Sequence, residues 1–192
     1  MLRASGLALL LGALPALAAP PLRDADLDRL ARFETAAGDA LLQALSTGAD
    51  ADVAILTRAL SGAPVPPTPS GDWNCRTLKL GGAVGLVVYT DFDCRIRGIG
   101  PTEWTFEKLT GSQQTEGTIA FQEGRAVYRG VGYTGDAPAM DYAALPAGQE
   151  PLEPNQTIPQ VAVFEQTSDT TARLMFPYPL LESDFDILYL TR

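Results

Sequence analysis

The sequence contains no histidine among its 192 residues, and this absence excludes several common kinds of site. Ser-His-Asp and Cys-His nucleophilic centres, His-ligated zinc and a histidine general base all need the missing imidazole. The chain has two cysteines, which are too few for a four-thiolate metal site. We therefore expect no metal, no cofactor and no catalytic residues, and an enzyme is the least favoured functional class.

Positive charge is also scarce. The chain carries 14 Lys and Arg against 23 Asp and Glu, which gives a formal net charge of −9. A nucleic-acid-binding protein needs a basic face, so this class is excluded. Disorder is excluded as well, because 46% of the residues are hydrophobic and only 19% are charged.

Long apolar runs are missing after the N-terminus. Residues 1–18 have the order of a secretory signal: Arg3, then an apolar stretch from Leu7 to Leu17, then a small-residue site ending at Ala18. The alternative is a buried N-terminal helix. No later segment approaches the roughly 18 apolar residues of a membrane span. We expect a soluble, periplasmic or secreted chain that begins at Ala19 and has no transmembrane segment.

The two cysteines, Cys75 and Cys94, are 19 positions apart in the sequence. In an exported protein they favour a disulfide, which would contribute on the order of 3 kcal/mol by restricting the unfolded chain. The alternative is a pair of buried free thiols. We expect the disulfide.

A helical pattern covers residues 19–62. Asp24, Asp26 and Asp28 stand where carboxylates complement a helix start, and a second helix is expected over 52–60. The expected apolar stripe of the first helix comprises Leu27, Leu30, Ala31, Ala37, Leu41, Ala44 and Leu45. Residues 63–70 read APVPPTPS, a proline-rich linker.

From residue 71 to 192 the hydrophobic period changes to two, which predicts a mainly β domain. Eight short strands with turn signals between most of them indicate an antiparallel eight-strand barrel-like domain, with the helical segment packed on it. A long irregular connection is expected over Asp136–Pro159. The predicted strands are Trp73–Leu80, Val84–Arg97, Glu103–Leu109, Gly117–Phe121, Arg125–Tyr133, Val161–Gln166, Thr171–Phe176 and Phe185–Leu190.

Alternation predicts how the first two strands pair. Cys75 and Cys94 both fall on the apolar, inward faces of their strands. If the two cysteines lie directly opposite each other, Arg76 faces Asp93 on the outside and Trp73 lies near Ile96.

Two resemblances follow from short motifs. Gly71-x-Trp73 resembles the triplet that opens the first strand of lipocalin-like barrels, and Tyr128-x-Gly130 resembles a feature of small bacterial protease-inhibitor barrels. A closer resemblance is to a bacterial exported family, domain of unknown function 4893, over nearly all of the mature chain. It implies export, the disulfide and a β domain, and no activity. Its motifs are Gly71-x-Trp73-x-Cys75-Arg76, Lys79-Leu80-Gly81, Phe92-x-Cys94-Arg95-Ile96 and Lys108-x-Thr110-Gly111-Ser112-Gln113, followed by Gly117.

Some charged residues have two interpretations. Alternation places Lys108 on the inward face with Trp104, where it is either a ligand anchor or a rim lysine with its ammonium in water. Asp91-x-Asp93 and Asp184-x-Asp186 are either paired carboxylates for acid–base or cation chemistry, or parts of a solvated outer face. The solvated face is favoured.

The leading functional hypothesis is a non-enzymatic, monomeric binding module that recognises a protein or envelope partner, with inhibition of a hydrolase as one form. The alternative is a lipocalin-like carrier of a small anionic or apolar ligand, with Trp73, Trp104 and Lys108 at the barrel mouth. A carrier needs an empty interior. We expect an interior filled by Trp73, Phe92, Phe106 and Phe121, which favours the binding module.

Overall fold

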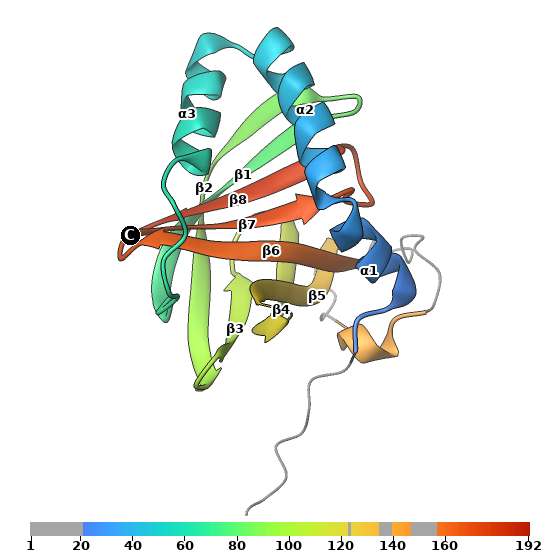
Figure 1. Ribbon diagram of the computed structural model, residues 1–192, viewed down its shortest axis with the longest axis vertical. Helices are drawn as coiled ribbons and strands as arrows, with labels where there is room; N and C mark the ends of the chain where they lie inside the picture. Colours follow the sequence, from blue (N-terminus) through green and yellow to red (C-terminus); the bar gives the residue numbers. More distant parts are fainter. Residues whose placement is uncertain (1–20, 123, 135–139, 147–156) are drawn as a thin grey trace, which may run out of the picture.

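Eight antiparallel strands close into a barrel in which the strands follow chain order and β8 returns to β1 (Figure 1). This confirms the predicted fold class. The computed structural model describes residues 21–122, 124–134, 140–146 and 157–192, so the predicted signal and much of the Asp136–Pro159 connection lie outside them. The strands are β1 Gly71–Gly81, β2 Gly85–Gly100, β3 Glu103–Lys108, β4 Gln113–Gln122, β5 Arg125–Thr134, β6 Ile158–Ser168, β7 Thr171–Pro177 and β8 Phe185–Thr191.

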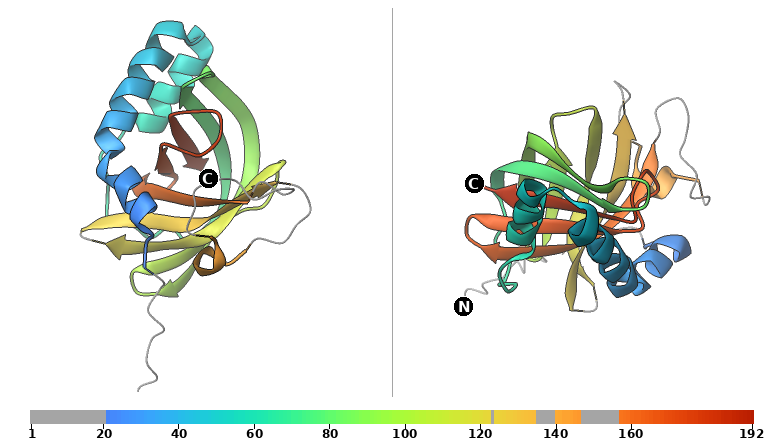
Figure 2. Two further views of the ribbon diagram at one scale, coloured as in Figure 1. Left: turned by 90° about the vertical axis from the view of Figure 1, so that its right-hand side faces the viewer. Right: turned by 90° about the horizontal axis from the view of Figure 1, so that it is seen from above.

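Three helices precede the barrel: α1 Asp24–Ala31, α2 Phe33–Thr47 and α3 Asp50–Leu60. α2 and α3 form a hairpin beside the barrel, and α2 packs on the outside of β1, β2, β7 and β8 (Figures 1 and 2). Within the described residues, none of the helices combines the length and apolar character needed to cross a membrane.

The apolar stripe predicted for the first helix is right only in part. Ala44 is buried, and Leu30, Ala37 and Leu41 pack against the same buried cluster, but Leu27 and Leu45 are exposed. The helix breaks at Arg32, and the buried face of α2 runs through Phe33, Ala36, Ala40 and Ala44. Small side chains at four-residue spacing let α2 approach the barrel wall closely. Leu45 is exposed as a result, because it lies on the opposite side of the helix from this alanine row.

Asp26 lies in the first turn of α1, as predicted, but its side chain has a further role that the sequence pattern does not indicate. Its side chain is completely buried and accepts hydrogen bonds from Arg23, Arg29 and the Tyr142 hydroxyl. Tyr142 belongs to a short 3-10 helix, Tyr142–Ala144, beside β5. One carboxylate therefore fastens α1 to a segment more than a hundred residues later in the chain.

The barrel interior is filled by inward-facing side chains from all eight strands. Phe106 and Phe176 pack edge-to-face against the fully buried Tyr128. Phe92 is partly buried, but Phe121 is 46% exposed, so the prediction that Phe121 fills the interior is wrong. Phe121 stands one residue before the end of β4, at the rim of the barrel. The buried core includes Trp73, Cys75, Cys94, Ile96, Trp104, Phe106, Ile119, Tyr128, Phe164, Leu174, Phe176, Leu188 and Leu190.

Cys75 and Cys94 form the predicted disulfide between β1 and β2, with their Cα atoms 5.8 Å apart. The predicted register is wrong by two residues, because the cysteines are diagonal neighbours. Cys75 pairs with Phe92, and Cys94 pairs with Trp73. Arg76 consequently forms its cross-strand ion pair with Asp91, at 2.8 Å, instead of Asp93. Alternation defines the face of a residue, and a shift of two leaves that face unchanged.

One end of the barrel is closed by the linker and by Arg192, the residue that follows β8. The indole N–H of Trp73 donates to the carbonyl of Pro69 at 2.8 Å. The guanidinium of Arg192 lies 4.1 Å from the Trp73 ring centre and donates to the carbonyl of Ser70. The linker is further held where Val65 bridges to Gln166 of β6. Trp73, Arg192 and the linker therefore cover this end of the barrel.

Candidate functional site

The other end of the barrel is polar. Here β1 and β3 end and β4, β6 and β8 begin, and each contributes an inward-facing polar side chain. We call this set of five residues the polar mouth: Lys79, Lys108, Gln113, Gln160 and Asp186. Together they line two neighbouring cavities.

Lys79 and Lys108 are the only lysines in the sequence, and both lie in the polar mouth. They are only 3% and 7% exposed, although lysine is rarely buried in proteins. Arginines of β1 and β2 instead lie outside the barrel: Arg76 pairs with Asp91, and Arg95 and Arg97 pair with Asp72. The two kinds of cation are therefore divided between the interior and the outer surface.

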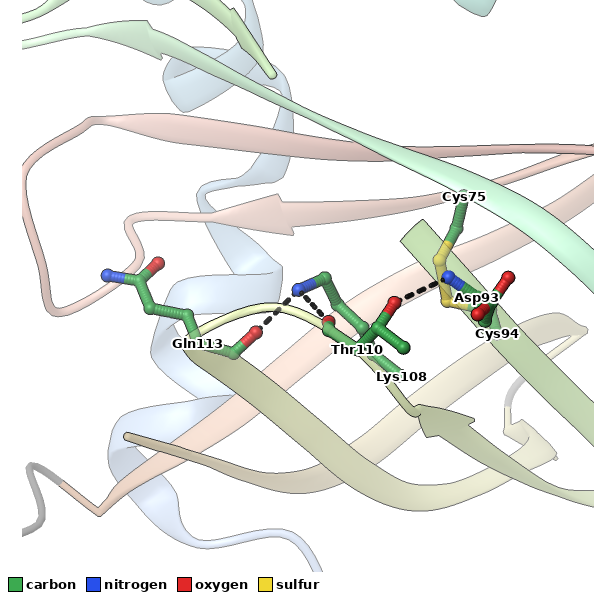
Figure 3. Close-up of a disulfide and its surroundings, with 6 residues drawn as sticks. All are labelled: Cys75, Asp93, Cys94, Lys108, Thr110 and Gln113. Atoms are coloured by element: carbon green, nitrogen blue, oxygen red, sulfur yellow. Dashed lines mark hydrogen bonds between the residues drawn. A yellow bond between two sulfur atoms is a disulfide. The ribbon is translucent and has the colours of Figure 1, made fainter. Parts of the chain in front are cut away.

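The ammonium of Lys108 turns back over the β3–β4 turn (Figure 3). It donates to the carbonyls of Gln113, at 2.6 Å, and Thr110, at 2.9 Å, and lies 3.9 Å from the Phe92 ring centre. Burial, together with the charge of Lys79, lowers the pKa of Lys108 to about 8. Lys108 therefore lies at the end of β3, at the rim of the barrel, but its ammonium is hydrogen-bonded to backbone carbonyls and is not left in water.

Lys79 meets the loop between β7 and β8. Its ammonium forms a 2.7 Å ion pair with Glu182, whose side chain is half exposed. Glu182 and Tyr178 of this loop both have positive φ, at 69° and 44°. Such backbone is unfavourable for residues other than glycine, so the loop holds Glu182 against Lys79 at a conformational cost.

Asp186 lies directly opposite Lys79 in the β1–β8 pair and faces the same cavity. Burial raises the pKa of its carboxyl to about 6, although the Lys79 charge and a hydrogen bond from the Ser183 hydroxyl oppose the shift. The prediction of a solvated outer face is wrong for Asp186. Its neighbour Asp184 accepts a hydrogen bond from the backbone N–H of Gly82 and holds two turns together.

A buried hydrogen-bonded network forms the floor of the polar mouth. The hydroxyls of Tyr128 and Thr115 share a hydrogen bond, and the Thr115 hydroxyl also reaches the side-chain carbonyl of Gln160. The Tyr128 ring packs on paired glycines, where a Cβ on Gly130 would lie 2.3 Å from the Tyr128 hydroxyl. Burial raises the pKa of Tyr128, so its hydroxyl stays neutral.

The cavities of the polar mouth are small. One is about 40 Å³ and includes Lys79; the other is about 60 Å³ and includes Lys108. Asp186, Gln113 and Gln160 line both. A third cavity of about 150 Å³ adjoins Phe92 and Lys108 on the side of the β3–β4 turn. This space suits a small polar group and not an acyl chain, which needs several hundred Å³.

The three ligand-site residues expected from the sequence do not form one pocket. Trp73 pairs with Cys94, which pairs with Lys108 on its other side, so both side chains enter the barrel in one row. They then diverge. Trp73 points to the closed end, and Trp104 lies near Ser70 and Gly98, whereas Lys108 points to the polar mouth. A ligand-binding role for all three stays a prediction.

Lys79, Gln113 and Gln160 were not predicted from the sequence as site residues, and Asp186 was predicted to lie on a solvated outer face. Lys79 carries a usable signal, because it shares the inward parity of Trp73 and Cys75. Asp186 does not, because β8 is apolar on both faces: Ile187 packs against the helices and Leu188 against the interior.

The stability of the folded protein should depend on pH through Asp186. Because the pKa of Asp186 is about 6 when folded and near 4 when unfolded, the folded state binds the extra proton between these values. The free energy of unfolding should therefore fall as pH rises through this range. We expect Asp186→Asn to raise stability by about 1–2 kcal/mol at pH 7 and not at pH 4, because lost attraction to Lys79 offsets part of the gain.

Urea unfolding of Asp186→Asn between pH 4 and 8 measures this effect. Asp39→Asn, which removes a carboxylate from the exposed surface of α2, is the matched control and should leave the pH profile unchanged. A loss of stability in Asp186→Asn at pH 7 would show that the attraction between the Asp186 carboxylate and the Lys79 charge outweighs the cost of burial.

The fold and the site define a small antiparallel β-barrel, closed by a tryptophan at one end and polar at the other. The chain belongs to the family described as domain of unknown function 4893, whose model matches residues 21–190. Two segments that carry this resemblance, Lys79-Leu80-Gly81 and Lys108 to Gln113, meet at the polar mouth. No curated protein and no solved structure matches the chain. Among the described residues, no group of acidic or cysteine side chains could hold a metal ion.

Proposed function

We propose that this protein is an exported, non-enzymatic binding module that contacts a protein or envelope partner through its polar mouth. The filled interior carries this proposal. Aromatic and branched side chains, together with the disulfide, occupy the space in which a carrier would hold an apolar ligand. Binding must then occur at the surface or at an end of the barrel, and the closed end is occupied by Trp73, Arg192 and the linker.

Export is consistent with the disulfide, since such bonds persist in oxidising compartments. A role without catalysis is consistent with the chemistry of the polar mouth. Lys108 donates two hydrogen bonds to backbone carbonyls, and Lys79 is held in an ion pair. Neither ammonium is placed against a nucleophile, and the Tyr128 hydroxyl is committed to Thr115.

A second candidate, a carrier of a small anion, is favoured by one observation: both lysines of the chain face the polar mouth. The cavities limit such a ligand to a few non-hydrogen atoms. This candidate uses the same polar mouth as the proposed binding module. The two candidates differ in whether the bound anion is a free small molecule or part of a partner.

A fluorescent fatty-acid probe should not bind the mature protein. The reason is that the cavities at the polar mouth are far smaller than an acyl chain, and the interior beyond them is filled. Fluorescence titration measures this directly, with a known lipid carrier as the positive control. Saturable, tight probe binding that Lys108→Met weakens would establish the carrier of an apolar ligand.

Site-directed photo-crosslinking in the native cell envelope tests where the partner binds. A photoreactive residue at Gln114, which lines both cavities, should give a discrete adduct. The same residue at Thr57, exposed on α3, should give none. An adduct formed from Thr57 and not from Gln114 would move the binding surface to the helices and contradict the proposal.

A further inference from the structure

We propose that the polar mouth is a carboxylate-binding site, in which Glu182 of the β7–β8 loop occupies Lys79 until a carboxylate from outside displaces it. This inference rests on the proposed function, because it takes the polar mouth as the binding surface. It adds two points to the proposed function: the recognised chemical group is a carboxylate, and Glu182 competes with that carboxylate for Lys79.

The charge of the polar mouth supports a singly charged anion. Near neutral pH, two ammonium groups, Lys79 and Lys108, share this end of the barrel with the carboxylates of Asp186 and Glu182. Glu182 is the more easily removed carboxylate, since it stands on an exposed loop while Asp186 stands within β8. When Glu182 leaves, the polar mouth carries one net positive charge, which one carboxylate neutralises.

The ion pair between Lys79 and Glu182 shows that a carboxylate fits beside the Lys79 ammonium. A carboxylate oxygen already lies 2.7 Å from the buried Lys79 ammonium. Glu182 holds Lys79 from a loop whose backbone is unfavourable, because the φ of Glu182 is positive. Leaving Lys79 without an anion would be costly, because a buried ammonium without a partner is strongly unfavourable. Exchange of Glu182 for another carboxylate avoids this cost, because Lys79 stays paired.

The remaining polar groups complete the site. The side-chain amides of Gln113 and Gln160 line both cavities and can donate hydrogen bonds to a carboxylate. Lys108 donates to two carbonyls, which leaves its third N–H for an anion. The cavity of about 40 Å³ beside Lys79 accepts a carboxylate, and the adjoining cavities accept the first atoms attached to it.

Lysine-selective ¹³C labelling gives a direct measurement, because the chain has only two lysines and each yields its own signals. Acetate should shift the Lys79 and Lys108 Cε signals with one Kd, of about 1 mM or weaker for so small a ligand. Glu182→Gln should lower this Kd about fivefold by removing the competing carboxylate. Lys79→Met should raise it at least about tenfold.

Two control variants separate the effect of the Lys79–Glu182 ion pair from the effect of changing the net charge of the protein. Glu34→Gln removes the same charge from the exposed surface of α2, and Arg58→Gln removes a cation from the exposed surface of α3. Both should leave the Kd for acetate unchanged. Because Glu182→Gln is expected to gain affinity, its result cannot be produced by misfolding, which protects the test if Lys79→Met folds poorly.

The two sources of a carboxylate are distinguished with N-acetyl-Ala-Ala carrying either a free C-terminal carboxylate or an amide. Tighter binding of the free-acid peptide than of acetate assigns the site to the end of a partner chain. Equal affinity for both assigns it to a free small acid. The amide should not bind in either case.

The proposal is overturned if acetate and the free-acid peptide leave both lysine signals in place, or if Glu182→Gln and Glu34→Gln change the Kd equally. Failure here can be told apart from failure of the proposed function. A Gln114 crosslink without carboxylate binding would leave the binding module standing, and carboxylate binding without a Gln114 crosslink would leave only the small-anion site.

Discussion

Asp26→Asn is expected to lower the free energy of unfolding by about 3–5 kcal/mol, the range found when one partner of a buried ion pair is removed. The Asp26 carboxylate is completely buried, while the guanidinium of Arg29 beside it is 6% exposed. Asparagine keeps the size of the side chain and removes the charge. Arg29 and Arg23 would then face a neutral amide that has one fewer acceptor oxygen.

The pKa of Asp26 supports this large effect. Burial alone would raise it, but the hydrogen bond from Tyr142 and the charge of Arg29 hold the pKa below its usual value. The stabilisation is therefore present above the unfolded pKa of about 4 and is lost as pH falls through the lowered folded value. The difference between Asp26→Asn and the wild-type protein should shrink below about pH 4.

Asp28→Asn is the matched control for this prediction. Asp28 stands on the same helix and pairs with Arg32, but its side chain is 62% exposed. Its removal should cost at most about 0.5 kcal/mol, as for other exposed helical pairs. Urea unfolding of both variants at pH 7 measures the contrast. Equal losses would show that the network around Asp26 does not fasten α1 to the barrel.

The contrast between Asp26 and Asp28 shows where sequence prediction reaches its limit. Both residues suit a helix start, and helical periodicity alone does not show which one is buried. That depends on Tyr142, which is 116 positions away from Asp26. The strands were more predictable, since a period of two persists over Val84–Arg97 and also placed Cys75 and Cys94 inside the barrel.

The candidate site could be predicted only in part. Lys108 alternates with two buried aromatic residues, Trp104 and Phe106, so its inward direction could be read from the sequence. Its partners could not, because the carbonyls of Thr110 and Gln113 meet it only through the path of a tight turn. The same holds for Lys79 and Glu182, which are brought together by a loop that no periodic pattern describes.

Replacing Cys75 and Cys94 together by alanine is expected to lower the free energy of unfolding by about 3 kcal/mol, the value for a crosslink across a loop of this length. In a chain of this size the loss corresponds to a decrease of about 6–12 °C in Tm. The bridge joins β1 to β2, and β2 continues on to pair with β3 through Cys94 and Lys108. Loss of the disulfide should therefore also destabilise the polar mouth.

A second part of this prediction concerns the turn that holds Lys108. The backbone N–H of Asp93, next to Cys94, donates to the hydroxyl of Thr110, whose carbonyl accepts from Lys108 (Figure 3). Without the disulfide, β2 is less restrained at this point, and hydrogen exchange of the β3–β4 turn should accelerate more than that of β5 and β6.

Calorimetry and hydrogen exchange of the oxidised protein, the reduced protein and the double alanine variant provide the comparison. The reduced protein should resemble the variant, and the variant should not respond to reductant. A wild-type Tm that reductant leaves unchanged would show that the crosslink adds nothing to a barrel already held by its filled interior.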